Sequence, residues 1–247
     1  MKKDKTILII GDSWGVPNYE GPQHGDDPDT HTEYRLRQLG YKVYNCAING
    51  GSNCRSIDLA RAYLNGEKIT LEPVNLNNTY HKNNEPGYID VVNPKIDWIV
   101  WFHTEVFRGR YYKPWKTIDE NILNAHNDYK NAADFFSTLN AKVAIIGGQA
   151  PVLTDILSLY IKPDFMIEDW RSDIIGKKLP PIYTFTHVEW IEKSPDTIEY
   201  KNNLLAKHKI IMDAMRDSKD FPDNCHPGSE AHKSLTNKLH EVFQGSI

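Results

Sequence analysis

The sequence predicts an α/β protein in which helices cover both faces of a mostly parallel sheet. Two observations support this prediction. Four short apolar runs lack polar alternation, as expected of strands that are buried on both faces. Segments with helical spacing of apolar residues lie between these runs, and alternating strands and helices are typical of parallel sheets.

The predicted elements follow in chain order. The strands are residues 6–11, 42–48, 97–102 and 142–148. The helices are residues 30–39, 56–64, 118–139, 198–215 and 230–243. The helix over 118–139 has its apolar residues on one face, which is the face expected to contact the sheet.

Two long segments interrupt this alternation. Residues 65–95 are polar and rich in Asn and Pro, and residues 151–196 are aromatic and interrupted by prolines. Loops of this length in a compact domain are usually functional or disordered. We therefore expect a single domain over residues 1–247 with two loop insertions, the second packing over the edge of the sheet that carries the site.

The composition limits the class of protein. The chain has 247 residues, 40% of them hydrophobic and 25% charged, and it can bury a core. Its formal net charge of −4 disfavours nucleic acid as a main partner. No window approaches the roughly 20 apolar residues of a membrane span. The N-terminal apolar run is too short for a secretory signal. A cytoplasmic protein is expected by default, although a virus-encoded or otherwise exported protein is compatible with this sequence.

The cysteines and histidines give no metal or disulfide signature. Cys46, Cys54 and Cys225 are few and odd in number, which disfavours a disulfide framework. No CxxC pair and no HExxH motif is present, so a zinc site and a metal hydrolase are disfavoured. Cys225 precedes His226, but adjacent residues rarely face each other, and an inert thiol is the preferred interpretation.

The turn after the first predicted strand carries the first chemical signal. Its sequence is Gly-Asp-Ser-Trp-Gly, from Gly11 to Gly15. In open parallel sheets, ligands bind beyond the carboxyl ends of the strands. Ser13 is in that place, and it can act as a nucleophile if a base removes its proton. The alternative is an ordinary turn in which Ser or Asp caps a following helix.

A candidate base lies near the other end of the chain. Asp223 and His226 are three residues apart, just before the last predicted helix. A catalytic imidazole needs one nitrogen toward the nucleophile and the other held by an acceptor. One such pair alone is more often a capped turn. In combination with Ser13 it predicts a Ser-His-Asp triad.

These blocks resemble the SGNH hydrolase superfamily, also called the GDSL family. The matching residues of the first and last blocks are Gly11, Asp12, Ser13, Asp223, His226 and Pro227. The resemblance implies a flavodoxin-like three-layer α/β/α sandwich with a mostly parallel sheet of about five strands. It also implies that Ser13 attacks an ester, that His226 transfers the proton and that Asp223 orients the imidazole. It implies no metal or organic cofactor, and Asp12 is expected to shape the turn.

The second block of the resemblance concerns the oxyanion. It falls in residues 45–53, where Gly50 is the best match and Gly51 is next to it. Asn53 is a further candidate in the same turn. With the Ser13 backbone N–H, Gly50 is expected to hold the oxyanion.

The third block departs from the family pattern. The family has an Asn whose side chain donates to the oxyanion, and residues 101–110 contain none. A ring N–H of His103 or the hydroxyl of Thr104 can donate in its place, whereas an ionised Glu105 cannot. Loss of one such donor costs about 10²–10³ in rate when nothing replaces it. Arg108 could bind an anionic group, but a solvated surface role is favoured.

The predicted function is therefore hydrolysis of a small-molecule or glycan ester, with an O-acyl (O-acetyl) carbohydrate or similar polar substrate preferred. Aromatic residues in expected loops could stack on sugar rings. They are Trp14, Tyr19, Trp115, Trp170 and Trp190. One alternative is a non-catalytic SGNH-like module that binds glycans or is structural. Another is a nucleotide- or flavin-binding protein, although the sequence lacks GxGxxG and the P-loop pattern.

Overall fold

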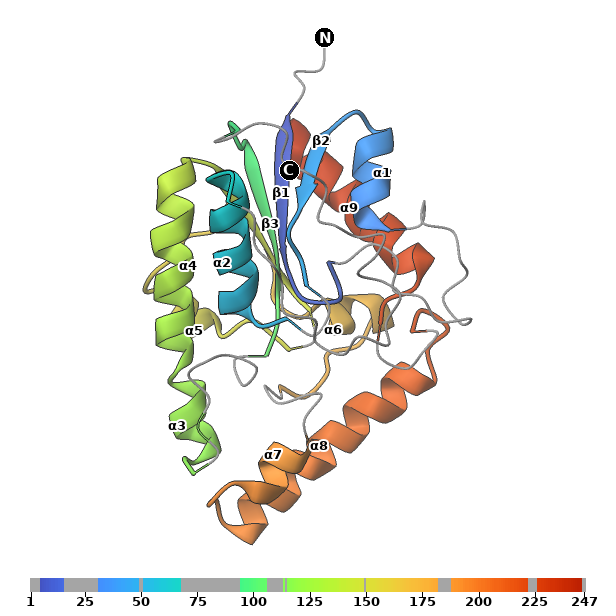
Figure 1. Ribbon diagram of the computed structural model, residues 1–247. Coiled ribbons are helices and arrows are strands. Elements are labelled where there is room, and N and C mark those ends of the chain that lie inside the picture. Colours follow the sequence, from blue (N-terminus) through green and yellow to red (C-terminus); the bar gives the residue numbers. More distant parts are fainter. Residues whose placement is uncertain are drawn as a thin grey trace.

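Five parallel strands form one sheet in the computed structural model (Figure 1). The structure describes residues 5–15, 31–48, 51–67, 94–105, 113, 115–148, 150–181, 188–221 and 226–245. The strands are β1 (Thr6–Gly11), β2 (Lys42–Asn45), β3 (Trp98–His103), β4 (Lys142–Gly147) and β5 (Phe165–Ile167). Their order across the sheet is β2-β1-β3-β4-β5, so the predicted flavodoxin-like fold is confirmed.

Nine helices surround this sheet in the part of the chain that the structure describes. They are α1 (Thr32–Gln38), α2 (Asn53–Leu64), α3 (Ile118–Ile122), α4 (Ala125–Leu139), α5 (Thr154–Leu157), α6 (Trp170–Ile175), α7 (Val188–Lys193), α8 (Ile198–Arg216) and α9 (Ser229–Gln244). Helices α2 and α4 lie on one face of the sheet, and α1 and α9 lie on the other (Figure 1). Among the described residues, no helix has the length and apolar character of a membrane span.

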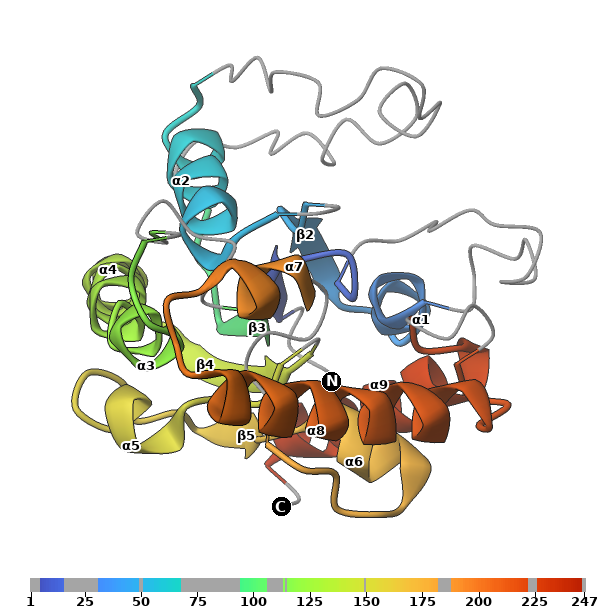
Figure 2. The same cartoon turned by 90° about the horizontal axis from the view of Figure 1, so that it is seen from below.

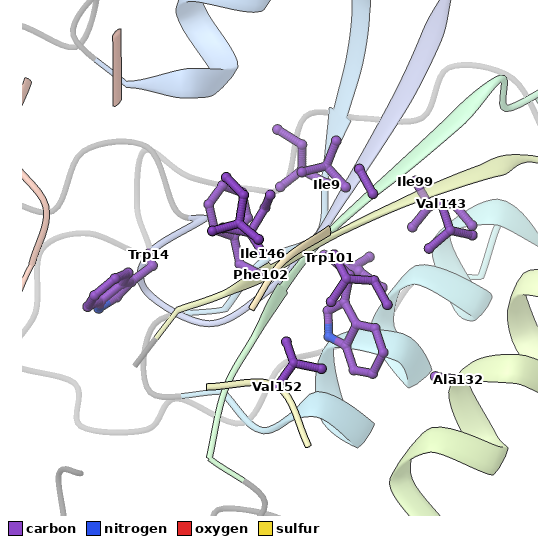
Figure 3. Packing of buried hydrophobic residues seen from close by; sticks show 14 of the residues in the cluster. Ile9, Trp14, Ile99, Trp101, Phe102, Ala132, Val143, Ile146 and Val152 are labelled. Carbon is purple, nitrogen blue, oxygen red and sulfur yellow. The ribbon is translucent and has the colours of Figure 1, made fainter. Parts of the chain in front are cut away.

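The central strand β3 shows how the sheet contacts both helical layers. All six of its residues are buried. Trp98 packs on Phe243 of α9, with ring centroids 4.8 Å apart. Trp101 packs on Phe136 of α4 at 5.5 Å. Because side chains alternate along a strand, these contacts are on opposite faces. Figure 3 shows the same alternation for Trp101 and Phe102.

The strand order places a switch point between β1 and β3. From β1 the chain continues to β2 on one side, and from β3 it continues to β4 on the other side. Ligands of open α/β sheets bind at such a point. The register pairs Gly11 with Phe102 at the carboxyl ends of the two strands. The turn that contains Ser13 therefore begins at the switch point.

The prediction of one helix over 118–139 is wrong, because the segment contains α3 and α4. Near Leu123 and Asn124 the backbone hydrogen bonds span three residues rather than four: Asn124 N–H donates to Asn121, and His126 N–H to Leu123. The apolar spacing continues across this break, so the pattern gave no sign of it.

The segment 151–196 was expected to be a loop insertion, and this is wrong for much of its length. It contains α5, β5, α6 and α7. Strand β5 has only three residues, which is too short for a strand pattern to be recognised. Most of the other expected insertion, 65–95, lies outside the described residues.

Three helices form a cap beyond the carboxyl ends of the strands: α3, α7 and α8 (Figures 1 and 2). The Ile118 N–H donates to Asp196 Oδ2 at 2.8 Å, which joins α3 to the connection between α7 and α8. The Tyr200 hydroxyl of α8 donates to Asp119 Oδ1 of α3 at 2.8 Å. Burial, together with the bond to Asp119, raises the pKa of Tyr200 to about 12, so it remains a donor at neutral pH.

Substitution of Gly11, at the end of β1, tests how closely β1 and β3 must approach each other. We expect Gly11→Ala to lower the free energy of unfolding by at least about 3 kcal/mol, because a Cβ there would lie 2.1 Å from the Phe102 carbonyl oxygen at a φ of +130°. Gly40→Ala is the matched control. Its φ is +86°, but a Cβ there meets nothing within 4 Å, so it should cost only about 1–2 kcal/mol. Urea unfolding measures both, and equal losses would contradict this account.

Candidate active site

The turn after β1 is held by its own backbone and by α2. The Gly11 N–H donates to Ser56 Oγ at 2.6 Å, and the Ser56 hydroxyl donates to the Cys46 carbonyl at 3.1 Å. The Asp12 carboxylate accepts from the Trp14 N–H at 3.0 Å, and the Asp12 carbonyl accepts from the Gly15 N–H at 3.0 Å. Asp12 thus shapes the turn that presents Ser13.

Ser13 and His226 meet although they are 213 residues apart in the chain. The distance from Ser13 Oγ to His226 Nε2 is 3.0 Å, and both side chains are buried. Close to His226, the Gly228 N–H donates to the Asp220 carbonyl at 2.7 Å. Asp223 and Cys225 lie outside the described residues, so the third member of the predicted triad stays a prediction.

Trp14, next to Ser13, packs against the segment that precedes His226. Its ring centroid is 6.0 Å from that of Phe221, which lies five residues before His226. It is 5.6 Å from Trp170 of α6, with the rings edge to face. Trp14 is 1% exposed and Trp170 is 3% exposed, so both are core residues and the hypothesis that they stack on sugars is wrong.

The second loop approaches the first through its backbone. The Ile48 N–H donates to the Gly11 carbonyl at 3.0 Å. Gly51 was also expected near the oxyanion, but its N–H donates to the Ile48 carbonyl at 2.8 Å, so this donor is occupied within the loop. Gly50, the preferred candidate, lies outside the described residues, and its role stays a prediction.

Asn53 holds the loop that follows β3. Its Oδ1 accepts from the Trp101 indole N–H at 3.2 Å and from the Thr104 N–H at 3.1 Å. Its Nδ2 donates to the Thr104 carbonyl at 3.1 Å. Asn53 was expected among the oxyanion residues, whereas these contacts give it a positioning role for the third loop.

A buried, neutral histidine, His103, is the last residue of β3 and directly precedes the third loop. His103 Nε2 lies 3.0 Å from the Tyr129 hydroxyl, which accepts from the Leu153 N–H at 3.0 Å. Burial lowers the pKa of His103 to about 3, against a smaller opposing effect of the Ala150 backbone. His103 is therefore uncharged at neutral pH. Thr104 and Glu105 are also fully buried.

Two further residues support the site without having been identified from the sequence. Ser56 ties β1 to β2, as described above. Asn45, at the end of β2, donates through Nδ2 to the Gly15 carbonyl and to Glu33 Oε2, both at 2.8 Å. The only available signal was a polar residue at the end of an apolar run. Arg108 lies outside the described residues.

The described residues contain no group of three or more His, Cys, Asp or Glu side chains that could hold a metal ion. Cys46 and Cys54 are buried and are not joined in a disulfide, and the Cys54 thiol donates to Asp128 Oδ1 at 2.8 Å. Burial raises the pKa of Cys46 to about 12, with a smaller effect of Glu33, so this thiol is a poor nucleophile.

No protein-family model matches the sequence, and no curated protein matches it. Several solved structures are similar to the chain. One is the psychrotrophic esterase EstA from Pseudoalteromonas sp., with 12% identity, 98% of each chain covered and a TM-score of 0.49. Another is a catalytic mutant of Axe2, an acetylxylan esterase from Geobacillus stearothermophilus, with 14% identity, 98% of this chain and 95% of that chain covered and a TM-score of 0.40. A third is AlinE4, an SGNH-hydrolase family esterase, with 12% identity, 100% of this chain and 98% of that chain covered and a TM-score of 0.36. These values are too low to assign an activity.

The buried His103 predicts a loss of stability in acid. Its pKa is lowered from 6.5 to about 3 on folding, so the unfolded chain binds this proton first as the pH falls. The contribution to stability is complete above pH 6.5 and decreases between about pH 6.5 and about pH 3. When the pH is lowered from 7.5 to 5.5, the free energy of unfolding should decrease in both proteins. The decrease should be about 1.4 kcal/mol smaller for His103→Gln than for the unaltered chain.

Urea unfolding at the two pH values measures this double difference. The comparison is insensitive to the cost of the substitution itself, because that cost is present at both pH values. An equal pH dependence of the two proteins would show that His103 takes up its proton normally in the folded state.

Proposed function

We propose that this protein is a serine ester hydrolase, with Ser13 as the nucleophile, His226 as the general base and Asp223 as the residue that orients the imidazole. The observation that carries the proposal is the 3.0 Å contact between Ser13 Oγ and His226 Nε2. A nucleophile and base within hydrogen-bond reach are the signature of an activated hydroxyl. Its place at the switch point of the sheet adds independent support.

The mechanism follows from this pair. His226 Nε2 accepts the proton of Ser13 as Oγ forms a bond to the ester carbonyl carbon. The tetrahedral intermediate collapses when the same proton passes to the leaving alcohol, which leaves an acyl-enzyme. Water then attacks the acyl carbon while His226 takes its proton. Return of that proton to Ser13 Oγ releases the carboxylic acid.

The negative charge that develops on the carbonyl oxygen needs donors. We assign the backbone N–H of Ser13 and that of Gly50 to it, as the resemblance implies. The third donor is then drawn from the end of β3 or from the loop that follows it. A neutral His103 or the Thr104 hydroxyl has the right chemistry. Asn53 supports this loop by fixing both backbone groups of Thr104.

The preferred substrate is an O-acyl, and in particular O-acetyl, ester of a carbohydrate or similar polar molecule. Residues 65–95 are polar and residues 151–196 are aromatic, and neither segment is continuously apolar, which disfavours a long acyl chain. Hydrolysis of long acyl esters without release of acetate from acetylated glycans would overturn this preference.

A second candidate is a non-catalytic module that binds a glycan. The absence of the family's third-block Asn favours it. A binding function does not require a serine and a histidine in buried hydrogen-bond contact, however, and we therefore place it second. The two candidates differ in whether Ser13 reacts.

A fluorophosphonate probe tests the nucleophile directly. We expect one adduct per chain at Ser13, located by intact mass and peptide mapping, because only an activated hydroxyl reacts at phosphorus. Ser13→Ala should abolish the adduct and lower kcat on 4-nitrophenyl acetate by at least about 10⁴-fold. Ser137→Ala is the matched control, since this serine is exposed on α4 and should change neither result.

His226→Gln should give the same losses as Ser13→Ala, because the two residues act as one unit. Circular dichroism and urea unfolding verify that each variant is folded. A folded protein that takes up no probe and turns over no ester would favour the binding module.

A further inference from the structure

Five aromatic residues were candidates for stacking on a sugar, and the structure separates them. Trp14 and Trp170 belong to the core. Tyr19 and the side chain of Trp190 lie outside what the structure describes. Trp115 is 71% exposed, the largest exposed fraction among the described tryptophans. A large aromatic side chain is normally buried, so this exposure calls for a physical reason.

The turn that presents Trp115 is held firmly by Asn121 of α3. The Asn121 Oδ1 accepts from the Lys113 N–H at 2.9 Å. Its Nδ2 lies within hydrogen-bond distance of the carbonyls of Lys113, Lys116 and Thr117, at 2.9, 3.3 and 3.1 Å. Asn121 itself is 3% exposed. One buried amide therefore fixes the backbone on both sides of the exposed indole.

The far side of the turn is fixed as well. Thr117 caps α3 through its hydroxyl, which accepts from the Glu120 N–H at 3.1 Å, and the Glu120 carboxylate accepts from the Thr117 N–H at 2.8 Å. The next N–H, of Ile118, donates to Asp196. A side chain on a preorganised backbone loses less conformational entropy when it binds a ligand.

One face of the indole has a cation above it. Lys113 Nζ lies 5.6 Å from the ring centroid of Trp115, which restricts the orientation of the ring. With 71% of the residue exposed, the rest of the aromatic surface remains open to solvent. The C–H face of a pyranose packs on such a surface, and the ammonium groups of Lys113 and Lys116 can donate to its hydroxyls.

The helix that follows Trp115 lies on the side of the sheet toward which Ser13 also faces, beyond the carboxyl ends of the strands. Trp115 precedes α3 by three residues, and α3 belongs to the cap beyond the carboxyl ends of the strands (Figures 1 and 2). The segment follows β3, which is the neighbour of β1. We propose that Trp115 is a stacking subsite for a sugar ring of an acylated oligosaccharide, remote from the ring whose ester Ser13 cleaves. This inference rests on the proposed function and makes the substrate an oligomer or polymer.

The test compares acetylated substrates of different length. Chemically acetylated xylo-, cello- and chito-oligosaccharides of at least four rings are assayed beside the corresponding acetylated monosaccharides. We expect at least one oligosaccharide to have a higher kcat/KM than its monosaccharide. Trp115→Ala should reduce the ratio of these two kcat/KM values about five- to tenfold, chiefly by raising KM for the oligosaccharide. Trp115→Phe should retain part of the preference for the oligosaccharide. Leu159→Ala, at a residue 67% exposed on the β5 side of the sheet, is the control and should leave the ratio unchanged.

Four outcomes would overturn this inference, and each is distinguishable from a failure of the proposed function. Cleavage of 4-nitrophenyl acetate with no preference for length in any series would overturn the subsite and leave the esterase intact. A preference for length that Trp115→Ala does not change would also overturn it. If no ester is cleaved, calorimetric titration of Ser13→Ala with the oligosaccharides decides, and binding that is no weaker in Ser13→Ala/Trp115→Ala would overturn the subsite. A change of oligomeric state in Trp115→Ala, seen by size-exclusion chromatography, would assign the indole to a protein contact instead.

Discussion

The approach of Gly11 to Phe102 is the constraint on which the site depends. The position where a Gly11 Cβ would lie is 2.1 Å from the Phe102 carbonyl oxygen, so β1 can leave the sheet here only as glycine. Two other contacts use the same residue. Its N–H reaches Ser56 of α2, and its carbonyl accepts from Ile48 in the second loop. One residue thus contacts β3, α2 and the second loop, and Ser13 follows two positions later.

Packing, rather than the Ser13–His226 hydrogen bond, brings the two ends of the chain together. A single hydrogen bond contributes about 0.5–1.5 kcal/mol net. This is too little to hold together Ser13 and His226, which are 213 residues apart in the sequence. Burial of one aromatic side chain contributes about 1.5–3 kcal/mol. Trp14, Trp170 and Phe221 are all buried and in contact through Trp14, and they supply several times the energy of that bond. The hydrogen bond is then a consequence of the packing and can be optimised for chemistry.

The sequence predicted the parts of this arrangement that depend on local pattern. The apolar runs gave four of the five strands, with ends within three residues of those observed. The Gly-Asp-Ser and Asp-x-x-His blocks identified the two residues that the fold brings together. Strand β5 was missed because three residues carry no periodicity, and the break between α3 and α4 because the apolar spacing continues through it. The contacts of Asn53 with Trp101 and Thr104 join residues about 50 apart, which no local pattern reports.

Burial determines which kind of donor the end of β3 and the third loop can offer under the proposed mechanism. His103 is neutral because burial lowers the pKa of its imidazole, and the residues that follow it, Thr104 and Glu105, are also fully buried. Under the proposed mechanism, stabilisation of the oxyanion then depends on dipoles rather than on a cationic imidazole. Dipoles that are already oriented act more strongly where water is excluded, since the local dielectric is low and no reorganisation is needed as charge develops. The burial that keeps His103 uncharged would therefore make any neutral donor in this loop more effective. An exposed loop of the same composition would lack this advantage.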